Sequence, residues 1–167
     1  MTAFAAIDFE TANHSPDSAC AVGIVVASDG RIVHRASYLI CPPSEEFVFT
    51  HIHGLTWGQV RDAPSFGELW PELRQQLEGV DYLAAHNAPF DRRVLAACCR
   101  THRASHISVP FVCTVQVARE VWDIYPTKLP DVCRHLGVAL QHHDAGSDAE
   151  ACSRVVLAAE ESGSQWR

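Results

Sequence analysis

The sequence predicts an α/β domain, with a mixed sheet whose first three strands are antiparallel and whose faces are covered by helices. Two observations predict it. Apolar, strand-like segments come first, and the rest of the chain alternates helical periodicity with short buried segments. Residues 1–167 contain no repeat and no linker, and 47% hydrophobic with 20% charged residues is an ordinary globular composition. We therefore expect a single domain over 1–167.

The first half of the chain predicts an antiparallel unit. A compact, mostly apolar strand is expected at 3–9, followed by strands at 20–28 and 31–40. Asp29-Gly30 joins the last two and is a strong hairpin signal. Pro42-Pro43 ends the third strand. The region 44–65 is expected to be irregular.

The second half predicts alternating helices and strands. Apolar residues at helical spacing predict helices at 66–78, 90–104, 114–123, 129–136 and 147–162. Short buried strands are expected at 80–86 and 109–114. Thr114 is expected to cap the helix that follows it. An antiparallel hairpin unit followed by β-α units predicts a mixed sheet rather than a purely antiparallel one.

Charge and targeting signals narrow the class of protein. A formal net charge of −7 argues against a broad basic face that coats nucleic acid. It leaves a nucleic-acid enzyme open, because bound cations would offset part of the acidic charge. The opening MTAFAAI lacks the basic start and long apolar core of a signal peptide, and no stretch has the length of a membrane span. A cytoplasmic protein is expected.

Seven cysteines and ten histidines raise the alternatives of a disulfide scaffold and a zinc site. The cysteine count is odd, no C-x-x-C occurs, and Cys98 and Cys99 are adjacent in a helix-like stretch. These features favour free thiols in a reducing cytosol. Most histidines stand singly, without the spacing of a zinc helix. A zinc protein built on Cys and His remains an alternative.

Two acids end the first predicted strand. Residues two apart in a strand share a face, so Asp8 and Glu10 should point one way, and Ile7 and Phe9 the other. Neighbouring carboxylates repel each other unless a cation lies between them. A strand that simply reaches solvent explains this pair equally well when it is taken alone.

Two further acids begin predicted helices. Asp91 follows a strand end, where α/β active sites collect, although an acid is also ordinary in a first helical turn. Asp148 precedes the buried positions Cys152 and Val155 by four and seven residues, which places it on the core-facing side. An unpaired carboxylate there is costly, so a cation is expected.

These acids predict a divalent-metal site. Oxygen ligands gathered from distant parts of a chain usually hold Mg²⁺ or Mn²⁺. His143 lies five residues before Asp148, and the turn 144–146 can swing its imidazole over that acid. A histidine beside such a cluster favours hydrolysis by a metal-activated water. Taken singly, His143 would be an ordinary surface histidine.

Three segments carry a family resemblance. DFET, HNAPFD and HDAGSDA resemble the three exonuclease motifs of the DEDD superfamily, in the subclass whose third motif is H-x-x-x-x-D. The exonuclease domain of the bacterial DNA polymerase III epsilon subunit belongs to this subclass. The resemblance runs from Ala5 to about Val156. IHGLT, residues 52–56, is similar to the family segment that lies against the 3′-terminal nucleotide.

The resemblance implies a ribonuclease H-like fold and metal-dependent 3′–5′ exonuclease chemistry. It implies that two Mg²⁺ or Mn²⁺ ions would be held by four acids, and that His143 would deprotonate the attacking water. The metal ligands implied are Asp8, Glu10, Asp91 and Asp148. The positions assigned to the terminal nucleotide are Thr11, Ile52, His53, Asn87 and Phe90.

Two departures from the family pattern shape the expectation. Gly146-Ser147 stands where many relatives carry a larger pair, so the loop of His143 is expected to be loose until substrate binds. The chain ends nineteen residues after Asp148, without the polymerase-binding tail of the epsilon subunit, which favours a stand-alone enzyme.

The expected function is hydrolysis of phosphodiester bonds at single-stranded or frayed 3′ ends, with DNA favoured and 5′-mononucleotides as products. Polymerase or repair proteins are candidate partners. An RNA-directed exoribonuclease, of the oligoribonuclease or ribonuclease T type, would share every catalytic residue. A non-catalytic module that binds nucleic acid or a polymerase is a further alternative. The absence of one of the four motif acids would have favoured it, and all four are present.

Overall fold

A five-stranded mixed sheet forms the centre of the fold in the computed structural model, which describes residues 2–166. The strand order is β3-β2-β1-β4-β5. The strands β1, β2 and β3 pair antiparallel, whereas β1–β4 and β4–β5 are parallel. The sheet confirms the predicted mixed topology. Its strands are β1 (Ala3–Thr11), β2 (Ala19–Ser28), β3 (Arg31–Leu39), β4 (Tyr82–Ala85) and β5 (Phe111–Cys113).

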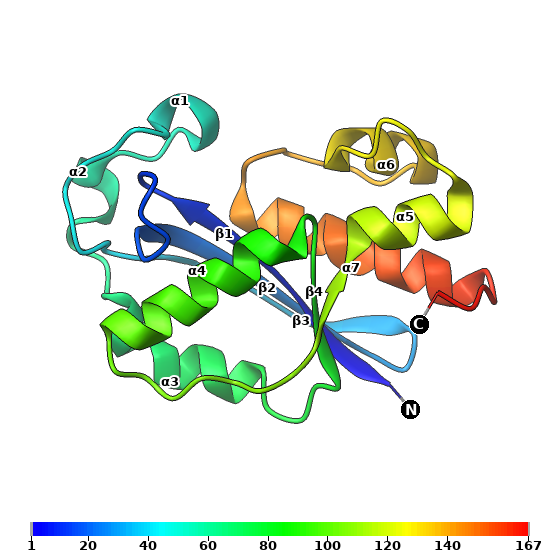
Figure 1. Ribbon diagram of the computed structural model, residues 1–167, viewed down its shortest axis with the longest axis horizontal. Helices are drawn as coiled ribbons and strands as arrows, with labels where there is room; N and C mark the ends of the chain where they lie inside the picture. Colours follow the sequence, from blue (N-terminus) through cyan, green and yellow to red (C-terminus); the bar gives the residue numbers. More distant parts are fainter. Residues whose placement is uncertain (1, 167) are drawn as a thin grey trace.

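Helices cover both faces of the sheet (Figure 1). One face carries α3 and α4, and the other carries α5, α6 and α7. No helix within residues 2–166 combines the length and apolar character needed to cross a bilayer. The helices are α1 (Thr50–His53), α2 (Trp57–Val60), α3 (Phe66–Gln76), α4 (Ala88–Thr101), α5 (Thr114–Trp122), α6 (Leu129–Leu136) and α7 (Ala145–Glu161).

Side chains of β1 alternate between two apolar cores. Ile7 and Phe9 pack in the core shared with α3 and α4. Phe4 and Ala6 pack in the core shared with α6 and α7. Because successive strand residues point to opposite faces, the acids that continue the second series are directed toward the α7 side. The alternation expected for the end of β1 is confirmed.

Two local expectations are wrong. The region 44–65 is not wholly irregular, since it contains α1 and α2, each four residues long. Thr114 does not cap α5: Cys113 is the capping residue, and the Thr114 hydroxyl lies 2.9 Å from His86 Nδ1 instead. The other ring nitrogen of His86 donates to the Thr127 carbonyl, so Nδ1 accepts from Thr114. A tertiary contact takes the hydroxyl that would have capped the helix.

Candidate active site

Three carboxylates from two distant segments meet at the end of β1. Asp8 and Glu10 come from β1, and Asp148 comes from the first turn of α7. One ligand oxygen from each lies within 4.8 Å of the others. One Asp148 oxygen, Oδ1, is buried and has no hydrogen-bond partner. An unpartnered buried carboxylate oxygen beside two further acids is a suitable ligand for a divalent cation.

The fourth predicted acid lies behind this group. Asp91, in the first turn of α4, is only 1% exposed, and its Oδ1 accepts a hydrogen bond of 2.9 Å from the backbone N–H of Phe9. This bond fixes α4 to the end of β1. The charge of Asp91 is close enough to raise the pKa of Asp8. All four predicted acids are therefore brought together, with Asp91 the most enclosed.

A glycine lets α7 approach the sheet this closely. Gly23 of β2 pairs with Asp8 in the antiparallel register. A Cβ built on Gly23 would lie 2.0 Å from the Ala145 carbonyl oxygen, well inside any real contact. The start of α7 thus rests directly on the backbone of β2, which brings the Asp148 side chain down to Asp8.

Burial and mutual repulsion raise the pKa values of the acids. Burial, followed by the charges of Asp91, Asp148 and Glu10, raises the pKa of Asp8 well above its ordinary value. Burial also raises the pKa of Glu10 to about 8, with Asp148 and Asp91 adding to the effect. The pKa of Asp91 rises to about 7 through burial, against the opposing N–H of Phe9. Such a cluster gains stability when cations replace protons.

Both adjacent histidines have a ring nitrogen within 4.8 Å of an Asp148 oxygen. The imidazole in contact with Asp148 belongs to His142, whose Nδ1 lies 3.0 Å from Asp148 Oδ2. His143 reaches the same oxygen with its backbone N–H, at 3.1 Å. The two rings stack with centroids 3.7 Å apart. His143 has a left-handed backbone, φ 68°, and one of its ring nitrogens lies within 4.8 Å of an Asp148 carboxylate oxygen.

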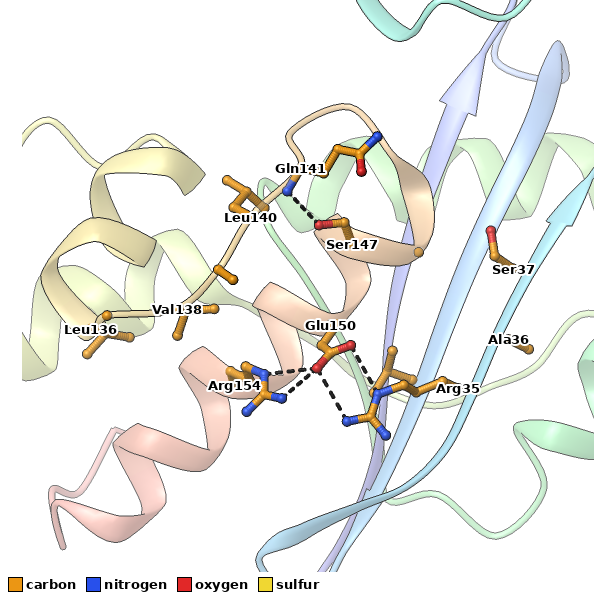
Figure 2. A pocket seen from close by; sticks show the side chains of 14 residues that line it. Arg35, Ala36, Ser37, Leu136, Val138, Leu140, Gln141, Ser147, Glu150 and Arg154 are labelled. Atoms are coloured by element: carbon orange, nitrogen blue, oxygen red, sulfur yellow. Dashed lines mark hydrogen bonds and ion pairs between the residues drawn. The ribbon is translucent and has the colours of Figure 1, made fainter.

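The loop before α7 is held by hydrogen bonds rather than loose. Asp144 caps α7 by accepting from the Ser147 N–H at 2.8 Å, and the Gln141 N–H donates to Ser147 Oγ at 2.8 Å (Figure 2). A Cβ on Gly146 would lie 3.3 Å from Ser37 Cβ, so glycine fits a tight contact with β3. The expectation that Gly146 loosens the loop finds no support in this geometry.

A cavity of about 320 Å³ opens over the carboxylates. Four of the five positions expected to contact a nucleotide line it, together with three of the four acids and both histidines. The fifth, Asn87, does not: its left-handed backbone at the start of α4 leaves the side chain exposed in a separate groove toward α5. The lining residues are Asp8, Phe9, Glu10, Thr11, Phe49, Ile52, His53, Phe90, His142, His143 and Asp148.

His53 fastens α1 to the end of β1. Its Nδ1 accepts from the Leu55 N–H at 3.0 Å, so its Nε2 carries the proton donated to the Thr11 carbonyl, also at 3.0 Å. Burial, followed by the charge of His51, lowers the pKa of His53 against the bond to Thr11. Both ring nitrogens are used, so this neutral ring offers a face rather than a nitrogen to a ligand.

Three lining residues, Phe9, Phe49 and His142, were not predicted to belong to the site. The sequence favoured His143 over His142 by its spacing to Asp148, and this spacing does not show which ring forms the hydrogen bond to that acid. Phe49 precedes Ile52 by three residues and is the capping position of α1. Recognising α1 as a helical turn would have placed both apolar side chains on one side.

A larger groove, about 860 Å³, lies on the outer side of the same loop (Figure 2). Both arginines in its lining are paired with the same acid, since Glu150 accepts from Arg35 and from Arg154. These contacts hold the pKa of Glu150 below its ordinary value, through Arg35 first. The groove contains none of the clustered acids, so the chemistry belongs to the smaller cavity.

Cysteine does not contribute to the potential metal sites. Within residues 2–166, the clusters suited to an ion are Asp8, Glu10 and Asp148, and His142, His143 and Asp148. All seven cysteines are free thiols and lie outside both. The alternative of a zinc protein with cysteine ligands therefore has no support in the described part of the chain.

Comparison with known proteins identifies the family to which the chain belongs. The model of the RNase T exonuclease family matches residues 5–156. The chain is 30% identical over 158 residues to the DNA polymerase III PolC-type of Thermotoga petrophila, covering 92% of this chain and 12% of that protein. The chain thus spans about a tenth of the length of such curated relatives.

Solved structures share the fold. Exonuclease X in complex with 5′ overhanging duplex DNA superimposes with a TM-score of 0.77 at 24% identity, over 97% of this chain and 94% of that one. A 3′-exonuclease that recognises the histone mRNA stem-loop gives a TM-score of 0.75 at 16% identity, over 96% and 82%. The fold is ribonuclease H-like, and the chain belongs to the RNase T exonuclease family, within the DEDD superfamily that its motifs resemble.

Proposed function

We propose that this exonuclease removes 5′-mononucleotides from 3′ ends, using two Mg²⁺ or Mn²⁺ ions held by Asp8, Glu10, Asp91 and Asp148. The observation that carries the proposal is the buried, unpartnered Oδ1 of Asp148 beside Asp8 and Glu10. An all-oxygen donor set fits hard divalent cations better than zinc. Bound ions would stabilise the attacking and departing oxygens of the phosphoryl transfer.

His143 is the proposed general base, as in the H-x-x-x-x-D subclass. It lines the cavity, and burial with the neighbouring His142 lowers its pKa, which keeps the imidazole neutral and able to accept a proton near neutral pH. The imidazole takes a proton from water, whose oxygen bonds to phosphorus. The bond from phosphorus to the 3′ oxygen of the preceding nucleotide breaks, and that oxygen gains a proton.

His142 has a different proposed part. Its contact with Asp148 Oδ2 satisfies an oxygen that a cation would otherwise take. We propose that the ring moves from this oxygen when metal binds and that the backbone N–H of His143 keeps its bond there. The third motif would then present the Asp148 carboxylate to the metal ions and the His143 ring to the attacking water.

The cavity suits an unpaired terminal nucleotide. Ile52, Phe49 and Phe90 supply apolar surface on which an unpaired base can stack. Single-stranded or frayed DNA is the favoured substrate, in line with the DNA polymerase relatives. The neighbour that recognises an mRNA stem-loop supports RNA as the alternative.

Three wider features belong to the same proposal. We propose one exonuclease domain over residues 1–167, of which Met1 and Arg167 lie outside the described residues. A cytosolic location accords with seven free cysteines. The polymerase relatives support a polymerase or repair protein as partner, so the expectation of a stand-alone enzyme stays a prediction.

The test uses matched 5′-labelled DNA and RNA oligonucleotides with Mg²⁺ or Mn²⁺. Stepwise shortening from an open 3′ end, resistance when the 3′ end carries a bulky block, and indifference to a 5′ block are expected. Faster shortening of the RNA would establish the exoribonuclease alternative. Internal cleavage of a circular single strand would contradict the proposed polarity, and binding without any hydrolysis would favour the non-catalytic module.

A further inference from the structure

A second groove, about 620 Å³, lies between the first turns of α4 and the segment from β5 into α5. Arg92, Arg93 and Arg119 line it, and none of its lining residues is acidic. The whole chain has 13 basic residues against 20 acids. Three cations without an acid at one groove of such a chain make a local anion-binding surface.

The arginines of this groove are available to a ligand. Arg92 and Arg93 are exposed, and no carboxylate within residues 2–166 lies at ion-pair distance from either. Arg119 donates to Thr127 Oγ1 and lies over the ring of Tyr125, which orients it without neutralising it. The arginines of the larger groove differ, because Glu150 already bridges them.

The walls of the groove are apolar between the arginines. A surface that alternates guanidinium groups with apolar side chains suits a single strand, because phosphates can meet the arginines while unpaired bases lie on the apolar walls. A duplex would offer phosphates but keep its bases stacked inside. The apolar lining residues are Ala88, Pro89, Ala96, Phe111, Cys113 and Val115.

The groove adjoins the candidate active site. Phe90 lines the catalytic cavity, whereas Pro89 and Arg93 line the groove, and all three belong to the first turns of α4. The guanidinium carbon of Arg93 lies 5.9 Å from the centre of the Phe90 ring. One helical turn rises about 5.4 Å, a distance that neighbouring nucleotides of a strand can span.

We propose that the arginine groove binds the sugar-phosphate backbone of the same strand whose 3′-terminal nucleotide occupies the catalytic cavity, on its 5′ side. The inference rests on the proposed function, because it is the catalytic cavity that fixes which end of the strand lies nearby. The groove would confer affinity for longer single strands, while the chemistry at the terminal nucleotide stays independent of it.

The test compares Arg92→Gln/Arg93→Gln with wild type on two substrates. One is a dinucleotide without a 5′ phosphate, whose single phosphate is the one cleaved in the catalytic cavity, so that it offers the groove none. The other is an oligonucleotide of about a dozen residues. KM for the long strand should rise roughly tenfold with kcat kept, and the dinucleotide should be hydrolysed as by wild type. The slope of log affinity against log salt should fall by roughly 1.4, since two phosphate contacts are lost. Arg92→Gln alone, which leaves the Phe90–Arg93 contact in place, should show about half of that change in slope.

The control is Arg100→Gln/Arg103→Gln, which removes the same charge from exposed positions near the other end of α4. Equal effects of the two double variants would contradict the proposed binding of the strand in the arginine groove. An unchanged KM for the long strand, with an unchanged salt slope, would contradict it as well. Anisotropy with a 3′-blocked, 5′-labelled strand measures binding without turnover. If only the groove variant loses binding, the inference is supported even when no hydrolysis is detected. If the groove variant hydrolyses the strand and binds it as wild type does, the proposed exonuclease activity stands and the groove is not a binding site.

Discussion

At the scale of single residues, the candidate site consists of carboxylates from a strand and from a helix that meet at the end of β1. The strand period placed Asp8 and Glu10 on one face, and the helical period placed Asp148 toward the core, because both periods are properties of the backbone. The hydrogen bond between the His142 ring and Asp148 forms in the loop before α7, where His143 has a left-handed backbone. No periodicity encodes that conformation, so the ring contacting Asp148 could not be predicted.

The two histidines give the first prediction. His143→Ala should lower kcat by roughly 10² to 10⁴-fold, the usual contribution of a general base, with metal affinity largely kept. His142→Ala removes a contact to Asp148 but no proton acceptor, so its loss should stay within about tenfold. Turnover of both variants at saturating Mn²⁺ makes the comparison. Equal losses, or a larger loss at His142, would refute the assignment of the base.

The raised pKa values of the acids give a second prediction. In the folded, metal-free protein the pKa of Glu10 is about 8 and that of Asp91 about 7, against ordinary values of 4.5 and 3.8. At pH values between the ordinary and the raised pKa of each acid, the folded state therefore binds more protons than the unfolded state. Their contribution to the free energy of unfolding is fullest at low pH and is lost as pH rises through about 7 to 8.

Thermal melting from the ordinary pKa of Glu10, 4.5, to above its raised value of about 8 measures this loss of stability. The series is recorded once with chelator and once with Mn²⁺. The metal-free melting temperature should fall with rising pH, and Glu10→Gln should flatten the fall. The stabilisation by Mn²⁺ should grow with pH, because binding displaces protons. A wild-type curve with no greater fall than that of Glu10→Gln would show that the pKa of Glu10 is not raised.

At the scale of elements, sequence patterns succeeded where an element is long or strongly periodic. The helix at 129–136 has the predicted bounds, and the strands of the opening hairpin differ by one residue at an end. The four-residue α1 and α2 were missed because a single turn shows no period. The capping box of Thr56 and Gln59 was the readable signal for α2.

The contact between α7 and β2 gives a third prediction. Gly23→Ala would place a methyl group 2.0 Å from the Ala145 carbonyl oxygen, so α7 must shift and carry Asp148 with it. The melting temperature should fall, and the stabilisation by Mn²⁺ and the turnover should fall more than in a variant that is merely less stable.

Gly58→Ala in α2 is the matched control, because its nearest neighbour would be Thr56 Oγ1 at 3.9 Å, an ordinary contact. It should leave melting temperature, Mn²⁺ response and turnover nearly unchanged. If Gly23→Ala behaved in the same way, the close approach of α7 would not be what positions Asp148.

At the scale of the whole molecule, the fold class was predictable because the chain begins with strand-like segments joined by a hairpin signal and continues with alternating helices and strands. The order of the strands and the burial on both faces follow from an antiparallel hairpin unit joined to parallel crossovers. The net charge of −7 describes the molecule only on average. It gave no sign that acids converge at one cavity while arginines line the next groove, since that separation arises only on folding.

The central claim is that the converging carboxylates hold the metal ions of a 3′ exonuclease. Asp148→Asn tests it most directly, since it removes one charge, keeps an oxygen for the His143 N–H, and has Glu161→Gln on the same helix as control. The measurement is Mn²⁺-dependent release of mononucleotides, with melting temperature alongside. We expect Asp148→Asn to abolish release, to keep or raise the metal-free melting temperature, and to lose most of the Mn²⁺ stabilisation. A folded Asp148→Asn protein with wild-type release and Mn²⁺ response would contradict the claim.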